Sequence, residues 1–453
     1  MASVTCYGGA GTVTGSKHLI TTRKGVRFLI DCGLFQGPPE LRELNRQLTI
    51  DDPSTLAFIL LTHAHLDHTG YLPYLVKKGF AGPIYGTSPT LALAEVILFD
   101  SAVLQEEEAR EANERGYSKH KPAKPLYEEK DVKNCLPLCK AVDPMTWFEP
   151  HPSVKVRMQP VGHILGACFI EVQVDGLTLV FSGDIGRNSD LLLEPPRKPS
   201  HADYLFMECT YGDRRHDPTP AIDQLRDLVK NVIDRRRQLI IPCFAVERAQ
   251  IVMLLLDMLH REWGESFPEV VLDSPMSHAV VETFKNYPKW HKPLQSDWTE
   301  MARNMSIVRD YQHSMESVEH FKPRIVIAGS GMVNGGRVLS YLEKYIENSH
   351  TTIALVGYQA EGTRGRDLLD GLEEVWIKGE KYAVRAEITH LGGMSAHADQ
   401  QELMDWLSEL QSKPKQVVLI HGEEQPALKL QSILQQHRHK VTIAQRNQSI
   451  ILD

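Results

Sequence analysis

Cysteine is scarce in this sequence. Seven cysteines occur among 453 residues, and no two of them form a Cys-x-x-Cys pair. Because disulfide scaffolds are dense in cysteine and four-cysteine zinc sites use closely spaced pairs, neither is expected. Cys135 and Cys139 are four residues apart on an expected helix, and we interpret them as part of its buried face.

Long apolar runs are also missing. No stretch approaches 18 uninterrupted apolar residues, so no transmembrane helix and no membrane partner are expected. The first residues lack the basic and apolar regions of a secretory signal, which favours a cytoplasmic location. With 42% hydrophobic and 24% charged residues, the composition is that of a globular protein rather than a disordered or collagen-like chain. The length predicts about two to four domains.

An excess of positive charge is absent as well. The chain has 50 basic and 58 acidic residues and a formal net charge of −8. Because nucleic-acid binding proteins usually carry a basic surface, this total alone argues mildly against such a partner. Two bound divalent cations would add about four positive charges, so an acidic total is still compatible with a local positive site.

The apolar pattern of the first 210 residues predicts short strands and turns, with a helix from Pro89 to about Arg115. Strands are expected at Val26–Ile30, Leu56–Leu61, Cys168–Val174, Leu177–Phe181 and Tyr204–Met207. The dipeptide Asp175-Gly176 predicts a hairpin between two of these strands. The basic segment Ser118–Pro125 is interpreted as a solvated loop, with a flap near a bound polyanion as the alternative.

From about Pro220 to Leu372, amphipathic helices alternate with short, fully apolar strands. Helices are expected at Ala221–Arg236 and Val246–Arg261, and strands at Leu239–Phe244, Val270–Leu272, Arg324–Ala328 and Ile353–Val356. This alternation is typical of a parallel sheet covered on both faces, so we predict an α/β domain inserted into the first one. The C-terminal segment again predicts short strands and helices, as in the first 210 residues. A helix is expected at Glu402–Leu410 and a strand at Gln416–Ile420.

The densest chemical signal follows the strand that ends at Leu61. His63, His65, Asp67 and His68 place four potential ligands within six residues. Imidazole and carboxylate groups suit Zn²⁺. Crowding them together without a metal would cost desolvation and repulsion. The segment therefore predicts a metal site rather than a solvated polar loop.

Three more polar groups repeat this design. His163 lies between glycines, Asp184 follows the strand Leu177–Phe181, and His421 follows the strand Gln416–Ile420. A lone histidine is more often structural than a ligand. The repetition of a strand end or glycine turn followed by a ligand type favours the metal-binding interpretation.

The HxHxDH segment at 63–68, with His163, Asp184 and His421, resembles the metallo-β-lactamase superfamily. Asp31, in Ile30-Asp31-Cys32-Gly33, matches that superfamily's first motif. The resemblance implies an αββα sandwich with two Zn²⁺ ions per chain. One zinc would be held by His63, His65 and His163. The other would be held by Asp67, His68 and His421. Asp184 would bridge the two ions, and Asp31 would orient ligand histidines from behind.

Further motifs resemble the β-CASP branch of that superfamily. Met207–Gly212 is similar to its motif A, Ser395–Asp399 to motif B and His421 to motif C. Asp273–Met276, Ala328–Met332 and Gly357–Thr363 match motifs of the inserted domain. The resemblance covers nearly the whole chain and is closest to RNA-cleaving enzymes such as the endonuclease subunit of the cleavage and polyadenylation specificity factor and its stand-alone prokaryotic relatives. It implies that residues 1–207 form the first part of a metallo-β-lactamase domain. Residues 208–378 would form the inserted β-CASP domain, and residues 379–453 the C-terminal part of the metallo-β-lactamase domain.

The sequence departs from the family pattern at three places. Glu247 stands where glycine usually precedes Arg-Ala-Gln, and Gly329 replaces the usual serine or alanine. Arg337 follows Gly335-Gly336 where relatives often have proline. These departures make phosphate contacts in that part of the chain less certain.

The resemblance implies a zinc-dependent ribonuclease that cleaves single-stranded RNA through a two-metal hydroxide and leaves 5′-phosphate and 3′-hydroxyl ends. Asp67, Glu208 and His397 are the expected catalytic residues. We expect His397 to be the general acid and Glu208 to orient it and raise its pKa. The alternative for Glu208 is a structural carboxylate at a strand end.

Glycine-rich turns after the inserted strands are candidates for substrate binding. Ser330, Gly331 and Met332 could present backbone N–H groups to phosphates, and Tyr358 could stack on a base. Arg248 is a further candidate for phosphate contact, with Arg337 and Arg364 as weaker ones. The alternative is that these segments are ordinary strand-to-helix turns.

Other functions stay open at this point. A DNA nuclease of the same family, a small-molecule metallo-hydrolase and a non-catalytic RNA-binding scaffold are the alternatives. The sequence does not decide between endonuclease and exonuclease action. A homodimer is implied because relatives often dimerise.

Overall fold

The computed structural model describes residues 1–116 and 121–453, and the chain forms two compact units. Unit 1 comprises Met1–Arg215 and His397–Asp453, and unit 2 comprises His216–Ala396. The units change at 216 and 397, whereas the resemblance implies boundaries at 208 and 379. Strand β19 (Glu387–Leu391) lies in unit 2, where it pairs in parallel with β16 (Thr351–Val356).

Unit 1 contains two seven-stranded sheets. The first has the order β22-β1-β2-β3-β4-β5-β6 and the second β21-β20-β11-β10-β9-β8-β7. The first sheet consists of β1 (Ala2–Gly8), β2 (Lys17–Thr21), β3 (Arg27–Ile30), β4 (Leu56–Leu60), β5 (Ile84–Thr87), β6 (Cys139–Val142) and β22 (Ser449–Leu452). The second consists of β7 (Phe148–His151), β8 (Val154–Pro160), β9 (Cys168–Val174), β10 (Leu177–Phe181), β11 (Tyr204–Glu208), β20 (Gln416–Ile420) and β21 (Val441–Ile443).

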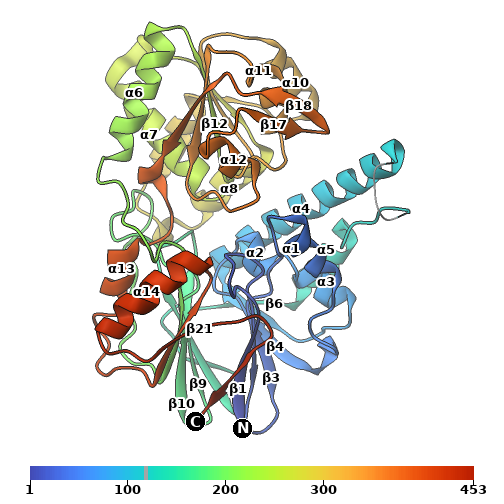
Figure 1. Ribbon diagram of the computed structural model, residues 1–453, viewed down its shortest axis with the longest axis vertical. Helices are drawn as coiled ribbons and strands as arrows, with labels where there is room; N and C mark the ends of the chain where they lie inside the picture. The colour runs from blue at the N-terminus through green and yellow to red at the C-terminus, as the bar shows by residue number, and fades with distance from the viewer. Residues whose placement is uncertain (117–120) are drawn as a thin grey trace. The chain divides into compact units, whose positions relative to one another are not determined.

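Helices flank both sheets of unit 1, which gives the expected αββα sandwich. They are α1 (Pro39–Glu43), α2 (Leu66–Thr69), α3 (Leu72–Lys77), α4 (Ser88–Arg115), α5 (Glu129–Cys135), α13 (Gln400–Trp406) and α14 (Glu424–Gln436). In Figure 1, α3 and α5 lie outside the first sheet, and α13 and α14 lie outside the second. The two chain ends meet because β1 and β22 are paired.

Two runs of parallel strands place the chemistry of unit 1. In the first sheet β3, β4, β5 and β6 are parallel, and in the second β10, β11, β20 and β21 are parallel. The carboxyl ends of parallel strands share one edge of a sheet, so polar residues that follow these strands come together. The hairpin predicted at Asp175-Gly176 is confirmed, and both residues have the positive φ of a tight hairpin turn.

The interpretation of Cys135 and Cys139 as one helical face is wrong. Helix α5 ends at Cys135, a 3-10 turn spans Leu136–Leu138, and Cys139 begins β6. Pro137 accounts for the break, since its ring cannot continue an α-helix. In the loop expected at Ser118–Pro125, residues 118–120 lie outside the described part of the chain.

Helix α4 is the one described helix that is long and apolar enough to cross a membrane by length and composition. A core helix passes the same test, and 44% of the apolar window of α4 is buried inside the protein. Leu98 and Ala102 of α4 belong to the buried core beside the first sheet, so this part of α4 packs against the core.

Unit 2 is built on one six-stranded sheet in which every pair is parallel, as predicted. Its order is β14-β13-β15-β12-β16-β19. The remaining strands are β12 (Gln238–Pro242), β13 (Val270–Asp273), β14 (Ser306–Ile307) and β15 (Arg324–Ala328), with a separate hairpin of β17 (Glu374–Ile377) and β18 (Glu380–Ala383). Its helices are α6 (Ala221–Asp234), α7 (Arg248–Trp263), α8 (Pro275–Asn286), α9 (Gln295–Arg303), α10 (Tyr311–Glu319), α11 (Val338–Tyr345) and α12 (Arg364–Leu369). In Figure 1, α6 and α7 lie on one side of this sheet and α10 and α11 on the other.

Candidate metal centre and catalytic groups

The loop after β4 is fixed by backbone contacts with the start of the chain. Ser16 N–H donates to Asp67 O at 2.8 Å, and Cys32 N–H donates to His68 O at 2.7 Å. A Cβ at Gly33 would lie 1.5 Å from Asp67 O, so only glycine permits this approach. The loop therefore presents His63, His65, Asp67 and His68 in one fixed arrangement.

Four candidate ligands converge on one point, and they are His63, His65, His163 and Asp184. His63 Nε2 and His163 Nε2 lie 3.1 and 3.2 Å from His65 Nδ1, and they lie 3.4 and 3.5 Å from Asp184 Oδ2. Ligand atoms at about 2.0–2.1 Å from a tetrahedral zinc are about 3.3 Å apart. Four of the six distances between these ligand atoms therefore match a tetrahedral zinc shell, and all six are within 4.8 Å.

A second group shares Asp184. His68 Nε2 lies 3.3 Å from Asp184 Oδ1 and 3.7 Å from Asp67 Oδ2. His421 faces the same two carboxylates, with Nε2 3.3 Å from Asp67 Oδ2 and Nδ1 3.4 Å from Asp184 Oδ1. Asp184 Oδ1 is buried and has no hydrogen-bonding partner among the described residues. A cation between these groups would satisfy it, so the donor set fits two metal positions with Asp184 between them.

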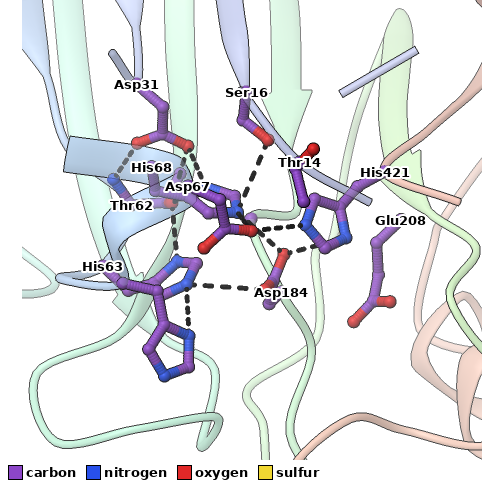
Figure 2. Close-up of polar contacts among 12 residues, drawn as sticks. Thr14, Ser16, Asp31, Thr62, His63, Asp67, His68, Asp184, Glu208 and His421 are labelled. Atoms are coloured by element: carbon purple, nitrogen blue, oxygen red, sulfur yellow. Dashed lines mark hydrogen bonds and ion pairs between the residues drawn. The ribbon is translucent and has the colours of Figure 1, made fainter. Parts of the chain in front are cut away.

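Asp31 holds His68 from behind. Its carboxylate accepts hydrogen bonds from Thr62 N–H, Thr62 Oγ1–H and His68 Nδ1–H, each at 2.8 Å. Figure 2 shows Asp31 and Thr62 on one side of His68 and Asp184 on the other. Because Nδ1 carries the donated proton, Nε2 is left as the ligating atom. This is the role that the resemblance implies for Asp31.

Burial and neighbouring charge set the protonation of these groups. Burial lowers the pKa of His63 well below its usual value and that of His65 to about 4, so both rings are neutral and can offer a lone pair. Burial opposes a charge on His68, but the surrounding carboxylates, Asp184 foremost, raise its pKa well above the usual value. The pKa of Asp184 lies well below its usual range, because neighbouring histidines outweigh burial. Metal binding would replace the proton of His68.

Glu208 and His397 form a pair beside Asp184. His397 Nδ1 lies 3.2 Å from Glu208 Oε1, and His397 Nε2 lies 4.0 Å from Asp184 Oδ2. The fully buried Glu208 also accepts hydrogen bonds from Ile185 N–H at 2.6 Å and Thr210 N–H at 3.2 Å. Burial opposes a charge on His397, but Glu208 and its neighbouring carboxylates raise the pKa of His397 above its usual value. The ring is therefore disposed to hold a proton.

Three contact residues were not identified from the sequence. Thr62 Oγ1 lies 3.0 Å from His63 Nδ1, and Thr210 Oγ1 lies 3.2 Å from His421 Nδ1. Both threonines lie inside the motif segments, and that location is the only sequence feature that could have identified them. Ser16 Oγ lies 3.5 Å from His68 Nε2, although the two residues are 52 positions apart in the sequence. No local sequence pattern predicts that contact.

The candidate substrate residues belong to unit 2. Ser330 Oγ–H donates to Gly335 O at 3.3 Å, and Gln359 Nε2–H donates to Gly331 O at 3.1 Å. A Cβ at Gly331 would lie 2.4 Å from Phe244 Cδ2, so the turn is tightly packed. Met332 and Tyr358 are half-buried. These contacts make a fixed loop at the carboxyl ends of β15 and β16.

The arginines of unit 2 differ in their surroundings. Arg248 is buried and donates from Nη1 to Met394 O, while its Nε and Nη2 have no hydrogen-bonding partner among the described residues. Arg337 Nη1 donates to the buried Asp273 Oδ1 at 2.6 Å. Arg364 donates from Nε to Trp376 O and from Nη1 to Val333 O. Arg337 and Arg364 therefore support loops, whereas Arg248 keeps donors for a ligand.

Family models match most of the chain. Residues 14–235 match the metallo-β-lactamase superfamily, residues 249–368 match a β-Casp domain, and residues 381–444 match a Zn-dependent metallo-hydrolase RNA specificity domain. The fold and the site thus define a metallo-hydrolase with a β-Casp insertion.

Curated relatives align over nearly the whole chain. Ribonuclease TTHA0252 of Thermus thermophilus is 33% identical over 98% of this chain and 98% of its own length. Two proteins named transcription termination factor FttA, from Methanosarcina mazei and Pyrococcus horikoshii, are 30% and 29% identical over 95% and 94% of this chain and 68% and 67% of their own. The chain belongs to the metallo-β-lactamase/β-CASP family of metal-dependent RNA nucleases.

A solved structure shares the fold. A protein of unknown function from Enterococcus faecalis V583 superposes with a TM-score of 0.54 over 100% of both chains at 16% identity. This likeness concerns the fold alone.

Proposed function

We propose that this chain is a zinc-dependent ribonuclease that hydrolyses phosphodiester bonds of single-stranded RNA with two zinc ions. The ligands would be His63, His65, His163, Asp67, His68 and His421, with Asp184 between the ions. The observation that carries the proposal is the close spacing of the ligand atoms in the first group, with the second group sharing Asp184. When bound, two divalent cations activate water and neutralise charge that builds on the phosphate oxygens.

The residues of the chain would handle the proton of the leaving group. Glu208 accepts a hydrogen bond from His397 Nδ1–H, which orients the ring and assigns Nε2–H as the proton donor. As the bond between phosphorus and the 3′-oxygen breaks, His397 Nε2–H passes its proton to that oxygen. The phosphate stays on the 5′ side of the downstream product, and the upstream product ends in a 3′-hydroxyl.

Unit 2 would hold the RNA. The loop at Ser330, Gly331 and Met332 offers backbone N–H groups to phosphates, and the half-buried Tyr358 offers a ring on which a base can stack. Arg248 has two unpartnered buried donors, which suit a phosphate oxygen. The name of the Thermus relative supports RNA as substrate. The proposal also includes a cytoplasmic location and the homodimer that the family resemblance implies, which light scattering tests.

The test uses end-labelled single-stranded RNA, a DNA of matching sequence and zinc analysis of each preparation. We expect RNA cleavage by the wild type, loss of cleavage in His68→Ala, and wild-type activity in His350→Ala, which changes an exposed histidine outside both ligand groups. Glu208→Gln should keep zinc and lose cleavage. The ladder of fragments distinguishes endonuclease from exonuclease action.

Each other outcome changes the assignment. Equal cleavage of DNA would favour a DNA nuclease of the same family. Two zinc ions per chain without cleavage of either substrate would favour an RNA-binding scaffold. Full activity of Glu208→Gln or His397→Ala with wild-type zinc content would exclude the proposed proton donor. Products that cannot be ligated without prior phosphorylation would exclude the proposed 5′-phosphate.

A further inference from the structure

A small cavity lies beside the second ligand group. Its volume is about 10 Å³, which is roughly the space that one water molecule needs. The polar part of its wall is formed by Ser16, His18, Asp31, Thr62, His68 and His421. A water in such a space needs two to four polar partners, and the wall supplies them.

His18 is the polar residue of this wall to which no role in the candidate metal site has been assigned so far. It lies on β2, is almost fully buried, and its Nδ1 is 3.3 Å from the thiol of Cys6, its partner on the neighbouring strand β1. Burial is the main cause that lowers the pKa of His18 to about 3, so the ring is neutral. A neutral imidazole has one donor and one acceptor nitrogen. With Nδ1 facing Cys6, Nε2 is left for the cavity.

Ser16 poses a problem for the candidate metal ligand beside it. Its hydroxyl oxygen lies 3.5 Å from His68 Nε2. The proton on His68 Nδ1 is donated to Asp31, so once metal has replaced the other proton it is Nε2 that supplies the lone pair. A serine hydroxyl that donates to Nε2 would compete with the metal for that lone pair.

We propose that the cavity holds one ordered water that directs the Ser16 hydroxyl away from His68, with His18 as the positioning residue that holds the water. Ser16 Oγ–H donates to the water, the water donates to His18 Nε2, and His18 Nδ1–H donates to Cys6 Sγ. The lone pair of His68 Nε2 then stays available for metal. The inference rests on the proposed ligand role of His68.

The first test is a high-resolution crystal structure of the zinc-loaded protein. We expect one water within hydrogen-bonding distance of both His18 Nε2 and Ser16 Oγ. A dry cavity, or a water that contacts neither atom, would overturn the inference.

The second test measures Zn²⁺ affinity by competition with a chelating indicator. His18→Leu keeps a similar volume but removes the acceptor, and we expect binding at the second position to weaken about 10- to 100-fold, as is typical when a group behind a ligand is lost. Binding at the first position should stay within about twofold. His18→Gln, whose side-chain oxygen can accept from the water, should recover most of the loss. His291→Leu changes another buried histidine, in unit 2, and should leave both affinities unchanged.

A double-mutant comparison separates this mechanism from a packing effect. If His18 acts by holding the Ser16 proton away from His68, then His18→Leu should have no effect on zinc affinity once Ser16→Ala has removed the hydroxyl. An equal loss in both backgrounds would reject the proposed chain of contacts. Wild-type protein that binds fewer than two zinc ions would instead contradict the proposed ligand set. Two ions bound equally well by wild type and His18→Leu would contradict only the role of His18.

Discussion

Glu247 occupies a backbone conformation that residues with side chains rarely adopt. Its φ is +71° and its ψ is −55°, and Arg248 N–H donates to Val246 O across it at 2.9 Å. These values describe the rare, strained form of the γ-turn. Glycine, the usual residue at this place in the family motif, enters that region without a Cβ clash. Replacing Glu247 by glycine should therefore relieve strain at the start of α7.

The size of the effect follows from two opposing contributions. A residue other than glycine in such a region costs about 1–3 kcal/mol. A new glycine loses about 0.4–1 kcal/mol through the greater freedom of the unfolded chain. We therefore expect Glu247→Gly to raise the free energy of unfolding by about 1–2 kcal/mol.

The matched control is Glu247→Ala, which removes the buried carboxylate but keeps the Cβ and the strain. Urea unfolding of the full chain, followed by tryptophan fluorescence, measures both variants. Four of the six tryptophans, at 263, 290, 298 and 376, lie in unit 2, so the signal reports mainly on that unit. If Glu247→Gly were no more stable than Glu247→Ala, the strain argument would be refuted.

Three further predictions concern other parts of the chain. Asp31→Asn should weaken zinc binding about 10- to 100-fold, because an amide cannot accept all three of its hydrogen bonds; unchanged affinity in a chelator competition would contradict this. Burial lowers the pKa of Lys17 to about 8 from 10.5, so between these values the unfolded chain binds more protons and stability rises with pH. The stability of wild type relative to Lys17→Met should thus increase by up to about 3 kcal/mol across this window, and an unchanged difference would exclude the shift. Gly331→Ala should raise KM for RNA about tenfold at constant zinc content, because its Cβ would meet the Phe244 ring; an unchanged KM would show that the loop does not bind substrate.

The cluster of candidate metal ligands could be predicted because its residues follow strands. Asp31 and His421 come directly after β3 and β20, and Asp184 and the HxHxDH segment begin three residues after the ends of β10 and β4. In each sheet these strands belong to a parallel run, so a one-dimensional pattern of strand ends becomes a cluster in space. The apolar strands themselves were predicted within about two residues for the same reason, because burial on both faces leaves long apolar runs.

Contacts that depend on register across the sheets could not be predicted. Cys6 meets His18 only because β1 and β2 pair in one particular register. Ser16 meets His68 because its N–H donates to Asp67 O in the loop that carries His68. The pairing of β19 within unit 2 could not be predicted for a similar reason. Strand β19 has a mixed sequence, and its place beside β16 follows from pairing rather than from its own apolar pattern.

Arg337 shows how a departure from a family pattern is compensated by distant residues. It pairs with Asp273, 64 positions earlier, and the same carboxylate accepts hydrogen bonds from Ser314 Oγ–H at 2.6 Å and Tyr341 O–H at 2.9 Å. Asp273 is fully buried, so its charge needs these partners. Arg337 also precedes Val338, whose N–H closes the Ser330 loop by donating to Gly329 O at 2.8 Å.

The three departures from the family pattern therefore share a physical setting. Glu247, Gly329 and Arg337 all lie in unit 2, at the loops proposed to hold RNA, and none lies in the metal centre of unit 1. A zinc coordination shell tolerates displacements of only about 0.2 Å, so its residues leave little freedom for change. Backbone contacts to phosphates tolerate a shift of a loop, provided that the loop stays rigid, and the Asp273 pair supplies that rigidity here. Differences in RNA preference between this chain and its relatives should thus map to the supports of the unit 2 loops. An exchange of Arg337 for proline should alter cleavage positions along an RNA while leaving zinc affinity unchanged, and an altered zinc affinity with the same cleavage pattern would reverse that assignment.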